Sequence, residues 1–196
     1  MDLGDLALSG DQLNASMSSG GGLEDGMQIK GRFSMRCTDS EGNELWNDEF
    51  DNLLTTLGKN FLLDTTLAGS AYTVTGPFMG LISSVGFTAV SAADTMASHA
   101  GWNEAQGATN VPDYTGNRQT PTWSAASAGS KTFAAGLAYV FTSNGTIQGA
   151  FMATGSGAVS TKASTAGTLF NAGTLSVAQP VITGNTLTVT WTGTLT

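Results

Sequence analysis

Residues 76–102 read GPFMGLISSVGFTAVSAADTMASHAGW, an apolar run whose only formal charge is Asp94. The uninterrupted apolar segment 78–82 predicts a strand that is buried on both faces of a sheet. Phe87 and Val90 continue the apolar pattern beyond it. We therefore expect this stretch to supply a core strand around which the rest of the chain is arranged.

The second half of the same stretch predicts a turn rather than a strand. Asp94 is a residue type that caps helices, so we expect it to begin a short helical turn over residues 94–97. His99, the only histidine of the chain, follows it, and Trp102 ends the stretch. This arrangement predicts that Trp102 points outward, into the loop that comes next.

Before this stretch the sequence alternates between apolar and polar residues, which predicts half-buried strands. Residues 29–37 and 44–50 form a predicted hairpin with a turn at residues 39–43. Cys37 lies on the apolar face and is expected to be a small buried hydrophobic residue. The bases of the first strand are expected to pair across the hairpin with acids of the second. These are Lys30, Arg32 and Arg36 with Glu44, Asp48 and Glu49.

After the stretch, the clearest alternation is in residues 131–141. Asn144-Gly145 is a strong type I′ hairpin signal and predicts that this strand pairs with residues 146–154. Further strands are expected over residues 168–182 and 187–195. Many short strands separated by turns predict a mainly β fold, either an antiparallel β-sandwich or a jelly-roll-like barrel.

One amphipathic helix is expected at about residues 52–68. Asn52 is a suitable N-cap and Gly69 a suitable stop. The apolar positions recur with helical spacing and should pack on the sheet. They are Leu53, Leu54, Leu57, Phe61, Leu62 and Thr65.

Charge is sparse and unevenly placed. Only 11% of the 196 residues are charged, and the formal net charge is −8. Residues 1–113 hold all fifteen acids and four bases, a net −11, whereas residues 114–196 hold three bases and no acid. So acidic a chain is a poor nucleic-acid binder, because phosphates need clustered Lys and Arg. A surface with few charges suits dry contact with other proteins, or marks a β scaffold rich in turns.

Residues 1–26 are expected to form an extended acidic N-terminal arm, and residues 27–196 a single β-rich domain. The arm has five acids, no base and the run Ser-Ser-Gly-Gly-Gly, so it buries too little apolar surface to fold alone. Four of its five leucines make it more apolar than a solubility tail, and we expect these four to contact a neighbouring subunit. They are Leu3, Leu6, Leu8 and Leu13.

No motif predicts catalysis, a cofactor or a metal. A site drawn around His99 with Asp94 and Glu104 has only one histidine, and His99 is more simply expected to bond the backbone of its own turn. With a single cysteine there is no disulfide and no cysteine cluster for zinc. The N-terminus does not resemble a signal peptide, and no apolar run is long enough to span a membrane, so no membrane partner is expected.

The loop over residues 103–119 is long for a compact domain, and such loops are usually functional or make contacts. Aromatic residues and arginine are enriched at interfaces. We therefore predict three contact residues in and beside this loop, Trp102, Tyr114 and Arg118.

Several runs resemble small structural proteins of tailed bacteriophages. They are FLLDTTLAGS at residues 61–70, YTVTGPFMGL at 72–81, AADTMASHAGW at 92–102 and, more loosely, GNTLTVT at 184–190. The resemblance covers roughly residues 29–196 and leaves out the first 26. It carries no known chemistry.

The resemblance implies a virion protein, made in the host cytoplasm and then bound to the particle. Its first implication is a head decoration (cement) protein that contacts the major capsid protein and copies of itself; its second is a tail- or fibre-associated protein, with possible host or glycan binding. Decoration would work through weak contacts repeated by symmetry. An enzyme is not expected.

Overall fold

The computed structural model describes residues 28–67, 75–107 and 109–195, and its strands begin with the predicted hairpin. β1 (Ile29–Thr38) and β2 (Glu44–Leu54) pair antiparallel, with Phe33 opposite Phe50. Two of the expected cross-strand ion pairs form, between Arg32 and Glu49 at 3.1 Å and between Arg36 and Glu44 at 2.7 Å. Lys30 and Asp48 make no ion pair with the described residues. Cys37 is fully buried, as its place in the alternation predicts.

The remaining strands are β3 (Phe78–Ser83), β4 (Asn103–Glu104), β5 (Ser130–Thr132), β6 (Leu137–Val140), β7 (Gly145–Thr154), β8 (Thr168–Val181) and β9 (Thr186–Leu195). Every strand pair is antiparallel, and the order along the sheet is β4-β3-β7-β8-β2-β1-β9-β5, with β6 also on β9. The predicted mainly β, antiparallel fold is confirmed.

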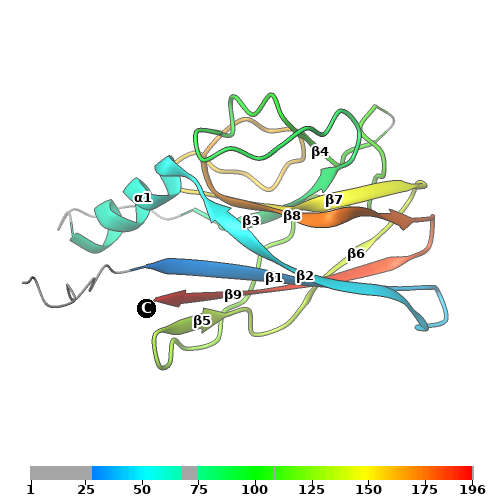
Figure 1. Cartoon of the computed structure of the whole chain (residues 1–196), viewed down its shortest axis with the longest axis horizontal. Coiled ribbons are helices and arrows are strands. Elements are labelled where there is room, and N and C mark those ends of the chain that lie inside the picture. The colour runs from blue at the N-terminus through cyan, green and yellow to red at the C-terminus, as the bar shows by residue number, and fades with distance from the viewer. Residues whose placement is uncertain (1–27, 68–74, 108, 196) are drawn as a thin grey trace, which may run out of the picture.

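The strands form two packed sheets (Figure 1). We call β2, β1, β9, β5 and β6 sheet A, and β4, β3, β7 and β8 sheet B; the last three residues of β2 pair with β8 and so join the two. Neither end of the strand order pairs with the other among the described residues, so the architecture is an open sandwich and not a closed barrel.

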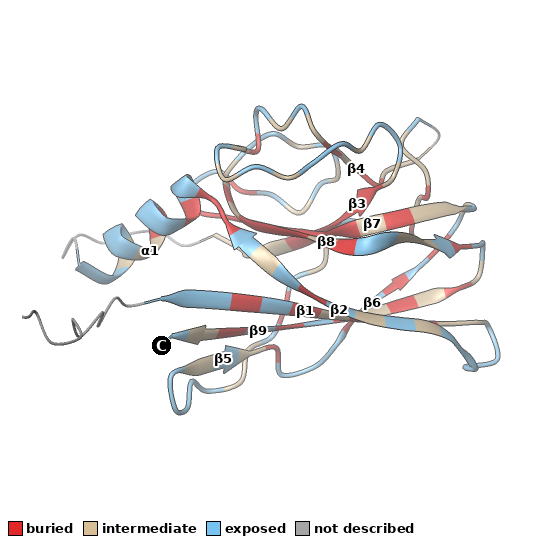
Figure 2. Ribbon diagram, viewed as in Figure 1, coloured by how far each residue is buried: buried red, intermediate tan, exposed pale blue. Residues whose placement is uncertain are grey.

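The main core lies between the sheets and takes side chains from both. β3 is buried at five of its six positions, as the apolar run at residues 78–82 predicts. The largest fully buried members of this core are Phe33, Met35, Met79, Leu81, Tyr114, Tyr139, Phe141 and Ile147. Figure 2 shows buried positions along both sheets and mostly exposed ones on the helix and the loops.

A second, smaller core covers the outer face of sheet B. It combines Ile82 of β3, Phe151 of β7 and Leu169 of β8 with Met96 and Trp102 of the loop that follows β3. That loop and residues 155–167 lie over sheet B, so the molecule has a third layer without regular structure on this side only (Figure 1).

The helix α1 (Thr56–Leu67) begins later than predicted. Asn52 is not its N-cap, because it belongs to β2 and its Oδ1 accepts a hydrogen bond from Trp191 Nε1 at 2.9 Å. Thr55 caps the helix instead, accepting a bond from the Gly58 amide at 2.9 Å. The predicted end at Gly69 lies outside the described residues. None of the described residues forms a helix with the length and apolar character needed to cross a bilayer.

Two strand predictions after residue 130 are wrong. The segment 131–141 is not one strand, although β5 and β6 both pair with β9. The Phe133 amide still donates to the Trp191 carbonyl at 3.1 Å, but residues 134–136 interrupt the pairing, and Ala135 is exposed. Asn144-Gly145 does not close a hairpin, because β6 belongs to sheet A and β7 to sheet B. The turn carries the chain from one sheet to the other.

Candidate functional site

The three predicted contact side chains lie in the interior. Trp102, Tyr114 and Arg118 are only 1%, 1% and 3% exposed, so they cannot form a contact surface. The error has a physical reason: the loop folds back over sheet B, and large aromatic rings gain more by covering apolar strands than by facing water. The other predicted contacts, Leu3, Leu6, Leu8 and Leu13, lie outside the described residues.

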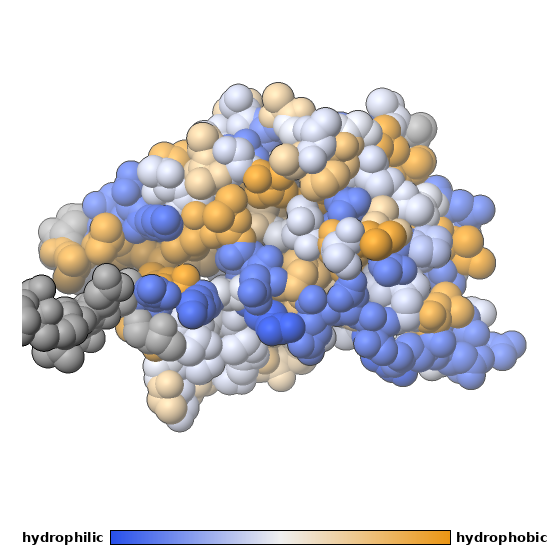
Figure 3. All heavy atoms as spheres, in the orientation of Figure 1, coloured by the Kyte–Doolittle hydropathy of each residue, from blue (hydrophilic) through white to orange (hydrophobic). Residues whose placement is uncertain are grey.

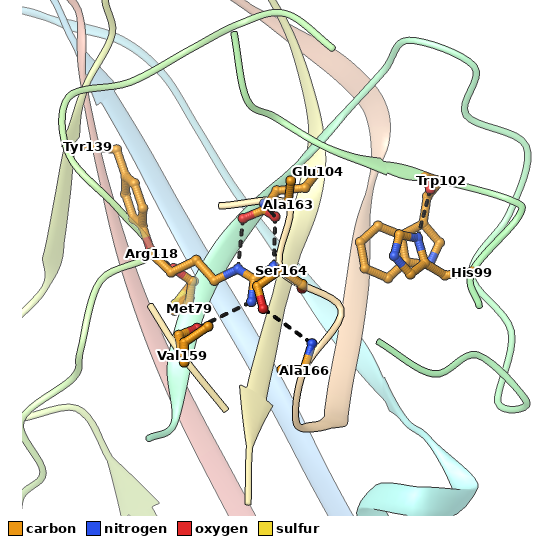
Figure 4. A network of polar contacts seen from close by, with 10 residues as sticks. All are labelled: Met79, His99, Trp102, Glu104, Arg118, Tyr139, Val159, Ala163, Ser164 and Ala166. Atoms are coloured by element: carbon orange, nitrogen blue, oxygen red, sulfur yellow. Dashed lines mark hydrogen bonds and ion pairs between the residues drawn. The ribbon is translucent and has the colours of Figure 1, made fainter. Parts of the chain in front are cut away.

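Arg118 is held in a buried ion pair with Glu104 of β4 (Figure 4). Its Nε and Nη2 donate to the two carboxylate oxygens at 2.9 and 2.8 Å, and Nη2 also donates to the Ser164 carbonyl at 2.8 Å. The Ala163 amide donates to the same carboxylate at 2.7 Å. Both oxygens of Glu104 are occupied, so the pair fastens residues 155–167 to β4 and leaves no free acid or base.

A second ion pair fastens the same layer from its edge. Lys162 donates to Asp113 Oδ1 at 2.5 Å and to the Tyr114 carbonyl at 2.7 Å. Its ammonium also lies 4.2 Å from the centroid of the Tyr114 ring, a cation–π distance. Sequence reasoning could not find these pairs, because the partners are far apart along the chain.

His99 has a structural role. It stacks on Trp102 with 3.9 Å between ring centroids, and its Nδ1 bonds the Trp102 carbonyl at 3.0 Å, as the expected backbone bond requires (Figure 4). Asp94 does not cap a helical turn; it accepts bonds from Trp102 Nε1 and the Ser91 amide, both at 2.9 Å. In the described ranges no three His, Cys, Asp or Glu side chains are grouped to hold a metal.

Titratable groups of the core are shifted by burial. Burial raises the pKa of the Tyr114 hydroxyl well above its usual range, and the charge of Glu104 raises it further. Burial likewise raises the pKa of Tyr139, whose hydroxyl donates to the Met79 carbonyl at 2.9 Å. The pKa of Cys37 rises to about 11 for the same reason. These shifts disfavour the charged forms and mark a dry core, not a reactive centre.

Two hollows lie at the α1 end of the sandwich. A hollow of about 380 Å³ opens between α1 and the strand ends of both sheets. Its lining is dominated by large apolar side chains. They include Phe61, Leu62, Trp123, Met152, Phe170, Trp191 and Leu195.

A second hollow of about 720 Å³ continues around α1. It shares Ile29, Leu62 and Leu195 with the first, and adds Leu63 and Leu67 of α1. We call the two together the α1 groove. Leu63 and Leu67 are 47% and 75% exposed, so the groove keeps apolar surface in contact with water. Figure 3 shows hydrophobic atoms gathered over α1 and beneath it.

Lysines border the α1 groove. Lys131 lines the first hollow, where its ammonium lies 5.9 Å from the ring centroid of Trp123. Lys30 and Lys59 line the second hollow. All three are exposed. An apolar groove with a cationic rim is suited to an apolar ligand that carries negative charge.

Sequence reasoning missed the groove because it assigned one apolar stripe of the helix to the core. A signal was present, since leucines occupy more of the helix than one stripe. Leu63 and Leu67 lie beside the stripe positions Leu57, Phe61 and Leu62. Of these, only Phe61 is buried.

Comparison with known proteins found no matching family model, no matching curated protein and no matching solved structure.

Proposed function

We propose that this protein is a structural component of a tailed-bacteriophage particle, and within it a decoration (cement) protein of the assembled head. Its role is adhesion through protein–protein contacts and not catalysis. The partners proposed are the major capsid protein and further copies of this chain.

The observation that carries the proposal is the α1 groove. It is lined by aliphatic and aromatic side chains, and its charged groups lie at the rim, which is the arrangement of sites that take polypeptide segments. The side chains first suspected of chemistry, His99 and Asp94, make hydrogen bonds within their own loop.

Two further features support it. The runs at residues 61–81 and 92–102 resemble structural proteins of tailed phages. A chain with 11% charged residues has few charges to desolvate when large surfaces meet. Contacts that are individually weak become strong when a lattice repeats them.

Cryo-electron microscopy of purified particles, with copy number from mass spectrometry, tests the proposal. The expected result is density for this fold at regular positions on the outside of the head, in a large fixed number. Few copies at the tail would replace the head assignment by the tail- or fibre-associated alternative. Absence from the particle would overturn both.

A further inference from the structure

We propose that the α1 groove binds this chain's own N-terminal segment, residues 1–27. The inference rests on the proposed function, in which the groove takes a polypeptide segment, and it names that segment. Three independent observations support the assignment: where the described chain begins, which side chains the groove leaves exposed, and where the unpaired bases lie.

The described chain begins at the groove itself. Gln28, its first residue, lines the second hollow, and Ile29 lines both. An extended chain spans about 3.3 Å per residue, so the residues between Leu13 and Gln28 can reach any part of the groove. A tether this short holds the segment at a local concentration of about a millimolar, far above that of a free partner.

The segment supplies what the groove lacks. Leu3, Leu6, Leu8 and Leu13 carry apolar surface in a segment with five acids and no base. Burying such side chains is favourable because their apolar surface is removed from water. On the other side, Leu63 and Leu67 of the groove are left 47% and 75% exposed. Docking would cover both sets of leucines at once.

Charge points to the same occupant. Residues 1–27 hold five acids and no base. Of the seven bases in the chain, four have carboxylate partners within the described residues; they are Arg32, Arg36, Arg118 and Lys162. No ion pair with a described acid forms at the other three, Lys30, Lys59 and Lys131, and all three line the groove.

A second copy of the chain could supply the same segment to the groove. The covalent tether favours the segment of the same molecule. At micromolar protein the tethered segment is present at a far higher effective concentration than one from another molecule. We therefore assign the α1 groove to the N-terminal segment of the same molecule. Exchange between molecules is an outcome that the test can detect.

The test places a photo-reactive benzophenone amino acid at Leu6 of the full chain and maps the cross-links by mass spectrometry. The sample is a micromolar mixture of ¹⁴N- and ¹⁵N-labelled protein, so links within one molecule are distinguished from links between two. The expected products join Leu6 to peptides from α1 and the end of β9 within one molecule. Links scattered over the surface would overturn the proposal, and links between molecules would overturn its same-chain form.

A charge variant with a matched control tests the lysines. Lys30→Gln with Lys59→Gln lowers the net charge by the same amount as Ser176→Glu with Val177→Glu, two exposed positions on β8 outside the groove lining. The lysine variant should lose the cross-link several-fold and the control should keep it. Equal yields in the two would overturn the role of the lysines.

A folding control and the choice of sample make the outcome interpretable. Circular dichroism melting of each variant verifies that the fold survives, since all four positions are exposed. The test uses the isolated chain, whereas the proposed function is tested on particles. A failure of the docking proposal therefore leaves the particle result standing, and the reverse.

Discussion

The outer face of sheet B and the α1 end of the sandwich differ in how their apolar surface is covered and their charges are paired. Over sheet B, the loop layer buries Trp102 and pairs Arg118 with Glu104 in bidentate geometry. At the α1 end, apolar side chains line an open groove, and no described acid pairs with its lysines. One region is closed by its own residues, and the other has an open apolar groove.

The residue types that suggest a functional site and the open groove lie in different regions of the molecule. Buried ion pairs and stacked aromatic rings in the loop layer resemble a site in the sequence, because they gather His, Asp, Glu, Arg and Trp. In the structure they are mutually satisfied and hold layers together. The groove has no conspicuous residue in the sequence, yet its apolar lining is what a binding partner needs.

The largest effect is expected from breaking the closed region. Arg118→Met leaves the buried carboxylate of Glu104 without its partner and should lower the free energy of unfolding by about 3–5 kcal/mol. Urea denaturation measures the loss. The Glu104→Leu, Arg118→Met double variant should lose less, because no charge is then left buried.

The matched control is an exposed pair. Arg36 and Glu44 lie 2.7 Å apart at the surface of the hairpin, so Arg36→Met should cost no more than about 1 kcal/mol. A similar loss in Arg36→Met and Arg118→Met would show that the loop layer is not closed by its buried charge pair.

The next effect tests how α1 is seated beside the groove. Gly58 lies against β8, where an added Cβ would come 2.1 Å from the Phe170 carbonyl oxygen. Gly58→Ala should therefore cost about 1–3 kcal/mol, although alanine favours an unhindered helix by about 1 kcal/mol. Thr66→Ala on the same helix is the control and should be near neutral. Stabilisation by Gly58→Ala would mean that α1 does not rest on sheet B.

The core shared by both regions predicts an alkaline transition. Burial raises the pKa of Cys37 from 9.0 to about 11, so the folded state holds its proton more tightly than the unfolded state. That contribution is fully present below pH 9 and is lost as the pH rises toward 11. Stability in urea should fall by about 2 kcal/mol over this window. Burial also raises the pKa of Tyr114 and Tyr139, whose usual value is 10.0, so these hydroxyls add to the slope above pH 10. Cys37→Ala should therefore flatten the slope between pH 9 and 10, and an unchanged slope there would contradict the assignment to Cys37.

The smallest effect on stability is expected in the groove. Leu67→Gln changes a side chain that is 75% exposed and should alter the unfolding free energy by no more than about 0.5 kcal/mol. The same variant should weaken the Leu6 cross-link several-fold. Val177→Gln, at a position 65% exposed on β8, should change neither. Equal cross-linking in the two variants would show that the N-terminal segment does not bind the α1 groove.

Local patterns predicted much of the fold. Alternation in residues 29–37 and the apolar run at 78–82 gave strands close to β1 and β3, because a strand's face is set by neighbouring residues. Which strands pair is not local. Asn144-Gly145 has the composition of a hairpin turn, but β6 and β7 gain more by joining different sheets across the core.

The site was less predictable than the fold. Whether a leucine of α1 lies in the core or in the groove depends on how far β8 and β9 extend beside the helix. The spacing of residues within 52–68 does not carry that information. The expected exposure of Trp102, Tyr114 and Arg118 failed in the same way. Their burial depends on residues 155–167 folding over the same sheet.

In this account the loop layer covers the outer face of sheet B by itself, whereas the α1 groove is covered by the N-terminal segment. Hydrogen exchange on the full chain, compared with a variant in which Leu3, Leu6, Leu8 and Leu13 are serine, tests it directly. The predicted result is faster exchange confined to α1 and the adjoining ends of β1 and β9, with residues 84–102 unchanged. Equal exchange throughout, or a change spread over both regions, would contradict it.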